Sequence, residues 1–114
     1  MSLRWRLAHI ADFLTETRNW TWLGIEPPSV VGTGQSSTSA GALAVLTEAF
    51  GRWRALLTNP DVGLSVQVGP PAGPYGQGPR RSFVLHIADE LIHHAAEAAL
   101  LRDLYAGTVE LPAP

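Results

Sequence analysis

The sequence predicts an all-α fold with three main helices joined by long loops, and three observations support this prediction. Apolar residues recur at helical spacing in three separate segments, over residues 3–20, 39–57 and 81–105. The segments between them are rich in proline and glycine, which interrupt regular structure. Only one short stretch alternates like a strand, and a lone strand has no partner with which to form a sheet.

The composition is that of one small domain covering residues 1–114. Hydrophobic residues make up 46% of the chain and charged residues 16%, a balance that excludes an intrinsically disordered protein. The formal net charge of -2 offers no basic surface for nucleic acid. No apolar run approaches the roughly 20 residues that cross a bilayer, and no signal peptide precedes the first helix. We therefore expect a cytoplasmic protein without a membrane or nucleic-acid partner.

The first predicted helix covers residues 3–20 and is followed by a long crossover loop. Four residues at helical spacing form its apolar face: Leu3, Leu7, Ile10 and Leu14. Between residues 24 and 39 the chain has no hydrophobic period and contains the pair Pro27–Pro28 together with several Gly and Ser residues. A connection of this length permits neighbouring helices to run parallel.

The second predicted helix runs from Ser39, as its N-cap, to Leu57, and Asn59 and Pro60 end it. Its apolar face is formed by Leu43, Leu46, Phe50, Trp53 and Leu57. Residues 60–80 contain five prolines and several glycines, a composition typical of a loop. Within this loop we interpret residues 64–68 as an extended segment.

The last predicted helix covers residues 81–105, with Gly107 as its C-terminal exit. Its core-facing stripe consists of Phe83, Ile87, Leu91, Ala98, Leu101 and Tyr105. Glu90 and His94 fall inside this stripe, where packing is expected to be driest. A buried carboxylate costs several kcal/mol unless it is paired, hydrogen-bonded or bound to a metal.

The polar residues of the last helix predict a divalent-metal site. Glu90 and His94 are four residues apart, so both ligand atoms lie on one side of the helix. His9 is the only histidine outside this helix and is the natural third ligand. Cysteine is absent, so a metal must be held by imidazole and carboxylate groups. Three such ligands leave coordination positions open, as in catalytic zinc sites. The competing interpretation is a buried hydrogen-bonded pair without metal.

Two segments resemble a known family. The stretch from Leu85 to Tyr105 resembles the last helix of DinB-superfamily proteins, and residues 2–10 resemble that family's second helix. The resemblance implies that His9 is the first metal ligand and His94 the last. Glu90 stands where the family commonly has a further histidine, so the metal preference of this chain is open.

The resemblance implies a four-helix bundle that binds a divalent metal, with zinc or nickel expected first and iron or manganese as alternatives. Family members resemble thiol-dependent transferases, isomerases and hydrolases, so a small molecule or a thiol is the expected substrate. The chain begins where the family's second helix begins. Either the family's first helix lies upstream of Met1, or a second subunit covers the groove; we expect a homodimer.

Catalysis at such a site needs a base, and His86 and Glu97 are the nearest candidates. As for metal ligation, His86 better fits a core position or a position supporting a ligand. Glu97 fits a hydrogen bond to a ligating imidazole or a surface ion pair with Arg81 or Arg102 equally well. The competing function is that of a non-catalytic dimeric helical protein with a structural metal site or a polar core. The four tryptophans are expected in the core or at an interface.

Overall fold

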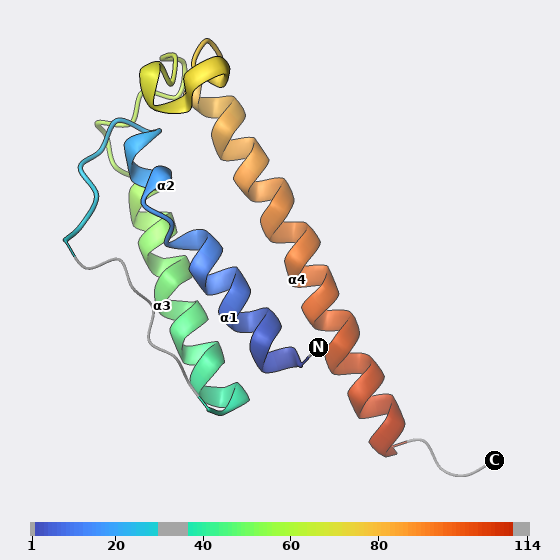
Figure 1. Ribbon diagram of the computed structural model, residues 1–114. Coiled ribbons are helices and arrows are strands. Elements are labelled where there is room, and N and C mark those ends of the chain that lie inside the picture. The colour runs from blue at the N-terminus through green and yellow to red at the C-terminus, as the bar shows by residue number, and fades with distance from the viewer. Residues whose placement is uncertain (1, 30–36, 111–114) are drawn as a thin grey trace.

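The structure is a computed structural model that describes residues 2–29 and 37–110. Within these ranges the chain is helical and has no strand, which confirms the predicted all-α class. The elements are α1 (Leu3–Leu14), α2 (Arg18–Thr21), α3 (Ser39–Leu57), a 3-10 helix η1 (Pro70–Tyr75) and α4 (Arg80–Glu110) (Figure 1). None of the described helices combines the length and the apolar character needed to cross a membrane.

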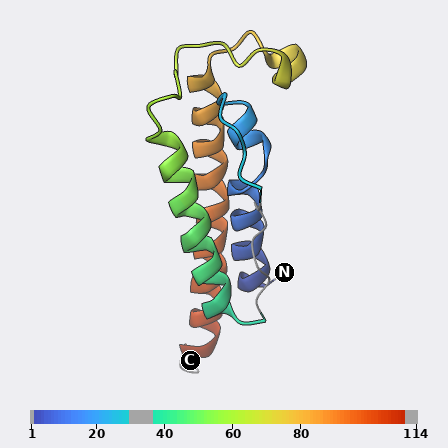
Figure 2. The same ribbon diagram turned by 90° about the vertical axis from the view of Figure 1, so that its left-hand side faces the viewer.

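Helix α1 packs against both α3 and α4, and the direct contact of α3 with α4 is slight. The colour gradient shows that α1 and α3 run in the same direction and that α4 runs in the opposite one (Figures 1 and 2). The parallel pair is the arrangement that a long first connection permits. The largest fully buried side chains are Ile10, Leu14, Leu23, Ile87 and Asn19. Because α1 lies against α4, residues of α1 can meet the polar residues of α4.

The first predicted helix is interrupted, so its expected span of 3–20 is wrong. Helix α1 ends at Leu14, which is also the last residue of its apolar period, and α2 begins at Arg18. The side-chain amide of Asn19 donates to the carbonyl oxygens of Phe13 and Leu14, at 3.0 and 2.9 Å. A buried side chain therefore satisfies the last carbonyls of α1, and the chain can turn without leaving them unpaired.

The span predicted for the second helix, 39–57, matches α3, but its N-cap is Thr38 instead of Ser39. The Thr38 hydroxyl accepts a hydrogen bond from the backbone N–H of Gly41 at 3.0 Å. Helix α4 starts at Arg80 and passes through Gly107 to Glu110, whereas the sequence predicted residues 81–105. A glycine inside a helix costs only about 1 kcal/mol, so a helix can end at Gly107 but can also continue through it.

The region over residues 60–80 is more ordered than a loop composition suggests. Pro70 and Pro71 occupy the first turn of η1, where a missing N–H costs nothing. The extended segment makes one isolated antiparallel bridge, between Gln67 and Pro79. The backbone N–H groups of Arg80 and Arg81 donate to the carbonyls of Val66 and Leu64, at 2.8 Å each. The segment thus caps the first turn of α4, whose N–H groups have no partner within the helix.

Candidate metal centre

His9 lies on the side of α1 that faces α4, between two aromatic neighbours. Its ring stacks on Trp5 with 5.1 Å between centroids and 6° between planes. On its other side the ring meets His94 of α4 edge-on, at 4.9 Å and 78°. The packing of α1 on α4 therefore brings together two of the three predicted ligands, which are far apart in the sequence.

Glu90 and His94 meet along α4 as their four-residue spacing requires. The Nε2 atom of His94 lies 3.5 Å from Oε2 of Glu90, longer than a good hydrogen bond. The His94 side chain is 17% exposed and packs against Phe13, with 6.0 Å between ring centroids. Its Nδ1 atom is buried and has no hydrogen-bond partner among the described residues. An unpaired buried nitrogen is costly, but an ion shared with Glu90 would be held by Nε2 and would leave Nδ1 as it is.

The Glu90 side chain is 38% exposed. It is therefore less buried than its position within the apolar stripe of the last helix predicts. It lies at the edge of the α1–α4 contact, where solvent reaches the carboxylate. The desolvation argument for a metal at Glu90 is therefore weaker than the sequence suggested. The argument for His94, which is better buried, is unaffected.

The donor chemistry and pairwise spacing of these residues fit a divalent ion. Two ligand atoms on one tetrahedral zinc ion stand about 3.4 Å apart, given bonds of about 2.1 Å. The 3.5 Å between His94 and Glu90 is close to this separation. Within the described ranges, however, no three His, Asp or Glu side chains are arranged to hold an ion as they stand. Binding would therefore require a side chain such as His9 to turn toward the other two.

The two candidate bases lie apart from each other. Glu97 accepts from Arg6 of α1 at 2.6 Å and from His93 at 2.9 Å, instead of pairing with Arg81 or Arg102. This carboxylate joins α1 to α4 one turn beyond His94, and both of its oxygens already have partners. His86 is exposed and lies one turn before Glu90, in the wall of a separate pocket.

The comparison with protein families gives one match. The sequence model of the DinB superfamily matches residues 1–98. The chain belongs to the DinB superfamily. The matched region includes His9, Glu90 and His94, so the whole candidate centre lies inside the shared part of this DinB-superfamily chain. No curated protein matches the chain. No solved structure matches it either.

Sequence reasoning missed two features that surround the centre. One is the Trp5 ring stacked on His9, and the other is the bridge from Arg6 to Glu97. The four-residue spacing of His93 and Glu97 could have indicated the half of this network that lies within α4. The half that crosses to α1 depends on how the two helices are aligned, for which the sequence holds no local signal. Trp20 and Trp53 are core residues, as expected.

Proposed function

We propose that this DinB-superfamily protein is a divalent-metal-dependent enzyme, a thiol-dependent transferase or a hydrolase, in which His9, Glu90 and His94 hold the ion. The observation that carries the proposal is the meeting of His94 with both other residues, at 4.9 Å from the His9 ring and 3.5 Å from the Glu90 carboxylate. A cytoplasmic location is part of the same proposal.

The surrounding residues would orient the ligands. Phe13 supports His94 from the side of α1, and the stack of His9 on Trp5 is the contact that changes when His9 turns toward the ion. The ion pair of Arg6 with Glu97 fixes the alignment of α1 on α4, on which the His9–His94 contact depends. A divalent ion in this position supplies Lewis-acid chemistry, and it would lower the pKa of a bound water or thiol. Zinc or nickel suits a mixed imidazole and carboxylate set, and iron or manganese are alternatives.

The test is metal content by mass spectrometry on untagged protein, comparing the wild type with His94→Ala. His93→Ala is the matched control, because the neighbouring His93 side chain is 71% exposed and lies outside the proposed ligand set. We expect near-stoichiometric metal in the wild type and in His93→Ala, and its loss from folded His94→Ala. Wild-type protein that binds no metal after reconstitution with zinc and nickel would contradict the proposal.

Activity is tested separately, by screening thiol transfer and hydrolysis with metal-loaded protein. The expected result is that any activity found disappears with the metal and in His94→Ala. Activity that survives removal of the metal would count against a catalytic role for the ion.

A second candidate is a non-catalytic homodimer, and the outer face of α4 supports the dimeric part of it. Leu85, Ile92 and Ala99 recur every seven residues on the side opposite the buried stripe, with Ala88 and Ala95 between them. Leu85 and Ile92 are 62% and 69% exposed. A helix that is apolar on two opposite faces is normally covered on both, and here one face is open to solvent. Dimerisation is compatible with either function.

Unfolding with and without chelator separates the two functions. A purely structural ion would contribute to folding outright, so its removal would lower the melting temperature strongly with no activity to lose. A catalytic ion with open coordination positions predicts a smaller shift together with loss of activity. The measurement is thermal unfolding by circular dichroism at one fixed protein concentration.

A further inference from the structure

A pocket separate from the candidate metal centre lies where α2, the end of the 60–80 region and the first turns of α4 meet. Its volume is about 680 Å³, within the range typical of sites for small organic molecules. Figure 1 shows these segments gathered at one end of the molecule, at the N-terminal end of α4. Its wall includes Arg18, Trp22, Val68, Ser82, Phe83 and His86.

The pocket has an aromatic wall made by two elements. The rings of Trp22 and Phe83 lie 4.7 Å apart at 47° to each other, so α2 and α4 present one continuous apolar surface. Val68, which is 9% exposed, extends this surface from the loop. Such a wall would bury the apolar body of a ligand, and the removal of apolar surface from water would stabilise the complex.

A cation stands over this wall. The Arg18 guanidinium carbon lies 5.5 Å from the centroid of the Trp22 ring and 5.8 Å from that of Phe83. Arg18 forms an ion pair with Glu16 through Nε, which lies 2.9 Å from Oε2 of that carboxylate. No Asp or Glu side chain lines the pocket, whereas His86 and the Ser82 hydroxyl do. The wall is therefore apolar with donor groups at its edge, and the nearest carboxylate to Arg18, that of Glu16, stands outside the lining and contacts Nε of the guanidinium.

We propose that this pocket binds an organic carboxylate with an aromatic or branched apolar body. The body packs on Trp22 and Phe83, and the carboxylate meets the Arg18 guanidinium, whose planar fork suits two carboxylate oxygens. Ser82 and His86 supply further hydrogen bonds at the edge. The proposal does not depend on a metal, because none of these residues belongs to the proposed ligand set.

The probes are 2-naphthylacetate and its neutral analogue 2-(2-naphthyl)ethanol, which share the apolar body and differ in charge. Binding to the full chain is followed by the indole N–H signal of Trp22 in ¹H–¹⁵N NMR spectra. We expect the acid to bind at least about tenfold more tightly than the alcohol, because only the acid can pair with Arg18. Equal affinities, or no shift of the Trp22 signal with either probe, would overturn the proposal.

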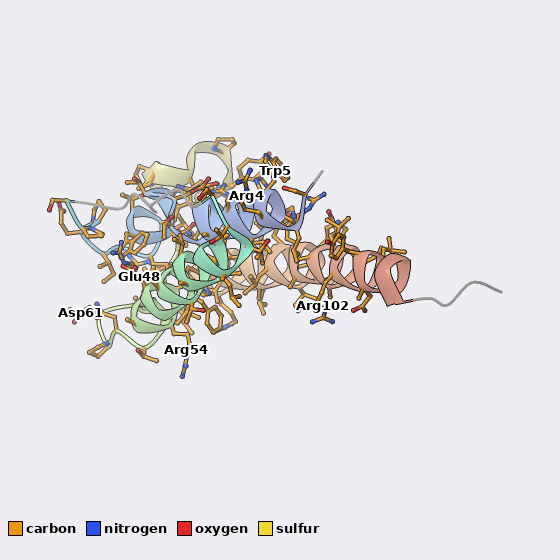
Figure 3. The ribbon with its side chains drawn as sticks, turned by 90° about the horizontal axis from the view of Figure 1, so that it is seen from below. Arg4, Trp5, Glu48, Arg54, Asp61 and Arg102 are labelled. Atoms are coloured by element: carbon orange, nitrogen blue, oxygen red, sulfur yellow. The ribbon has the colours of Figure 1, made fainter. Side chains whose placement is uncertain are left out.

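Two variants locate the site. Arg18→Gln is expected to weaken the acid about tenfold and leave the alcohol unchanged, whereas Arg54→Gln, on the outer side of α3, changes neither (Figure 3). Since Arg18 also contacts two rings, Ser82→Trp is a second test: Ser82 is exposed, and an indole there fills the pocket and should block both probes. Acid binding that persists in Arg18→Gln, or binding that persists in Ser82→Trp, would contradict the assignment.

Discussion

Asn19 is the residue on which the turn between α1 and α2 depends. It is fully buried, and its amide nitrogen serves the carbonyls of both Phe13 and Leu14. Its own Oδ1 is buried and has no partner among the described residues, so the whole amide is held through its nitrogen. Removing the amide would leave two carbonyls without their partner in a dry region, where each unsatisfied group costs about 1–3 kcal/mol.

We predict that Asn19→Ala lowers the free energy of unfolding by about 2–4 kcal/mol. The matched control is Asn59→Ala, because the Asn59 side chain accepts an exposed hydrogen bond from the backbone N–H of Asp61. That substitution should cost less than about 1 kcal/mol. Urea unfolding of the two variants at equal protein concentration measures the difference. Equal costs would show that the carbonyls of α1 find water instead.

Single residues also mark the limit of sequence reasoning. The meeting of His9 with His94 agrees with the expectation from spacing and resemblance, because both lie on faces that the hydrophobic period directs inward. The role of Asn19 was not predictable in this way. In the sequence alone, Asn19 cannot be distinguished from an exposed polar residue of a helix. Its buried role becomes clear only from its hydrogen bonds to the carbonyls five and six residues earlier.

Among the elements, α3 was the best predicted because its signals are local. A capping residue precedes its apolar period and Asn59–Pro60 follow it, so both ends can be assigned within a residue. The ordered structure of residues 60–80 was not predictable. Its hydrogen bonds join backbone groups, and backbone groups are the same for nearly all residue types. The composition of this region indicates that it contains turns, but it does not indicate which backbone segments hydrogen-bond to each other.

Substitution of glycine by alanine is expected to have opposite effects at Gly51 in α3 and at Gly76 in the 60–80 region. A Cβ at Gly76 would collide with the backbone carbonyl of Gly69, which cannot move without disturbing the hydrogen bond between these two residues. A Cβ at Gly51, inside α3, meets nothing within 4 Å. Gly76→Ala should therefore destabilise the protein by about 1–3 kcal/mol, and Gly51→Ala should stabilise it by about 0.5–1 kcal/mol.

Thermal unfolding of both glycine variants beside the wild type provides the measurement. The loop segment caps the first turn of α4, so Gly76→Ala should also speed amide hydrogen exchange at Arg80 and Arg81. Gly51→Ala should leave that exchange unchanged. A Gly76→Ala variant as stable as the wild type would mean that the contact between the two loop arms is not needed for the fold.

For the molecule as a whole, the open question is what covers α4. Helix α1 buries the stripe that carries Ile87 and Ala98, while the opposite heptad-spaced face stays in water. Alanines between the larger residues of that face let a second helix approach closely, and a two-fold axis would pair the face with its own copy. A second copy of this chain would therefore cover the face without any other partner.

We predict that the wild type is a dimer at micromolar concentration and that Ile92→Glu converts it to a folded monomer. Ile92 is 69% exposed in the single chain, so the substitution disturbs no intramolecular packing, but in a dimer it would bury two carboxylates facing each other. Val66→Glu is the control, because Val66 is 49% exposed on a loop away from α4's outer face. Size-exclusion chromatography with light scattering reports the mass, and circular dichroism reports the helix content. A monomeric wild type would leave the outer face of α4 to a different partner, and a dimer that survives in Ile92→Glu would place the subunit contact elsewhere on the surface.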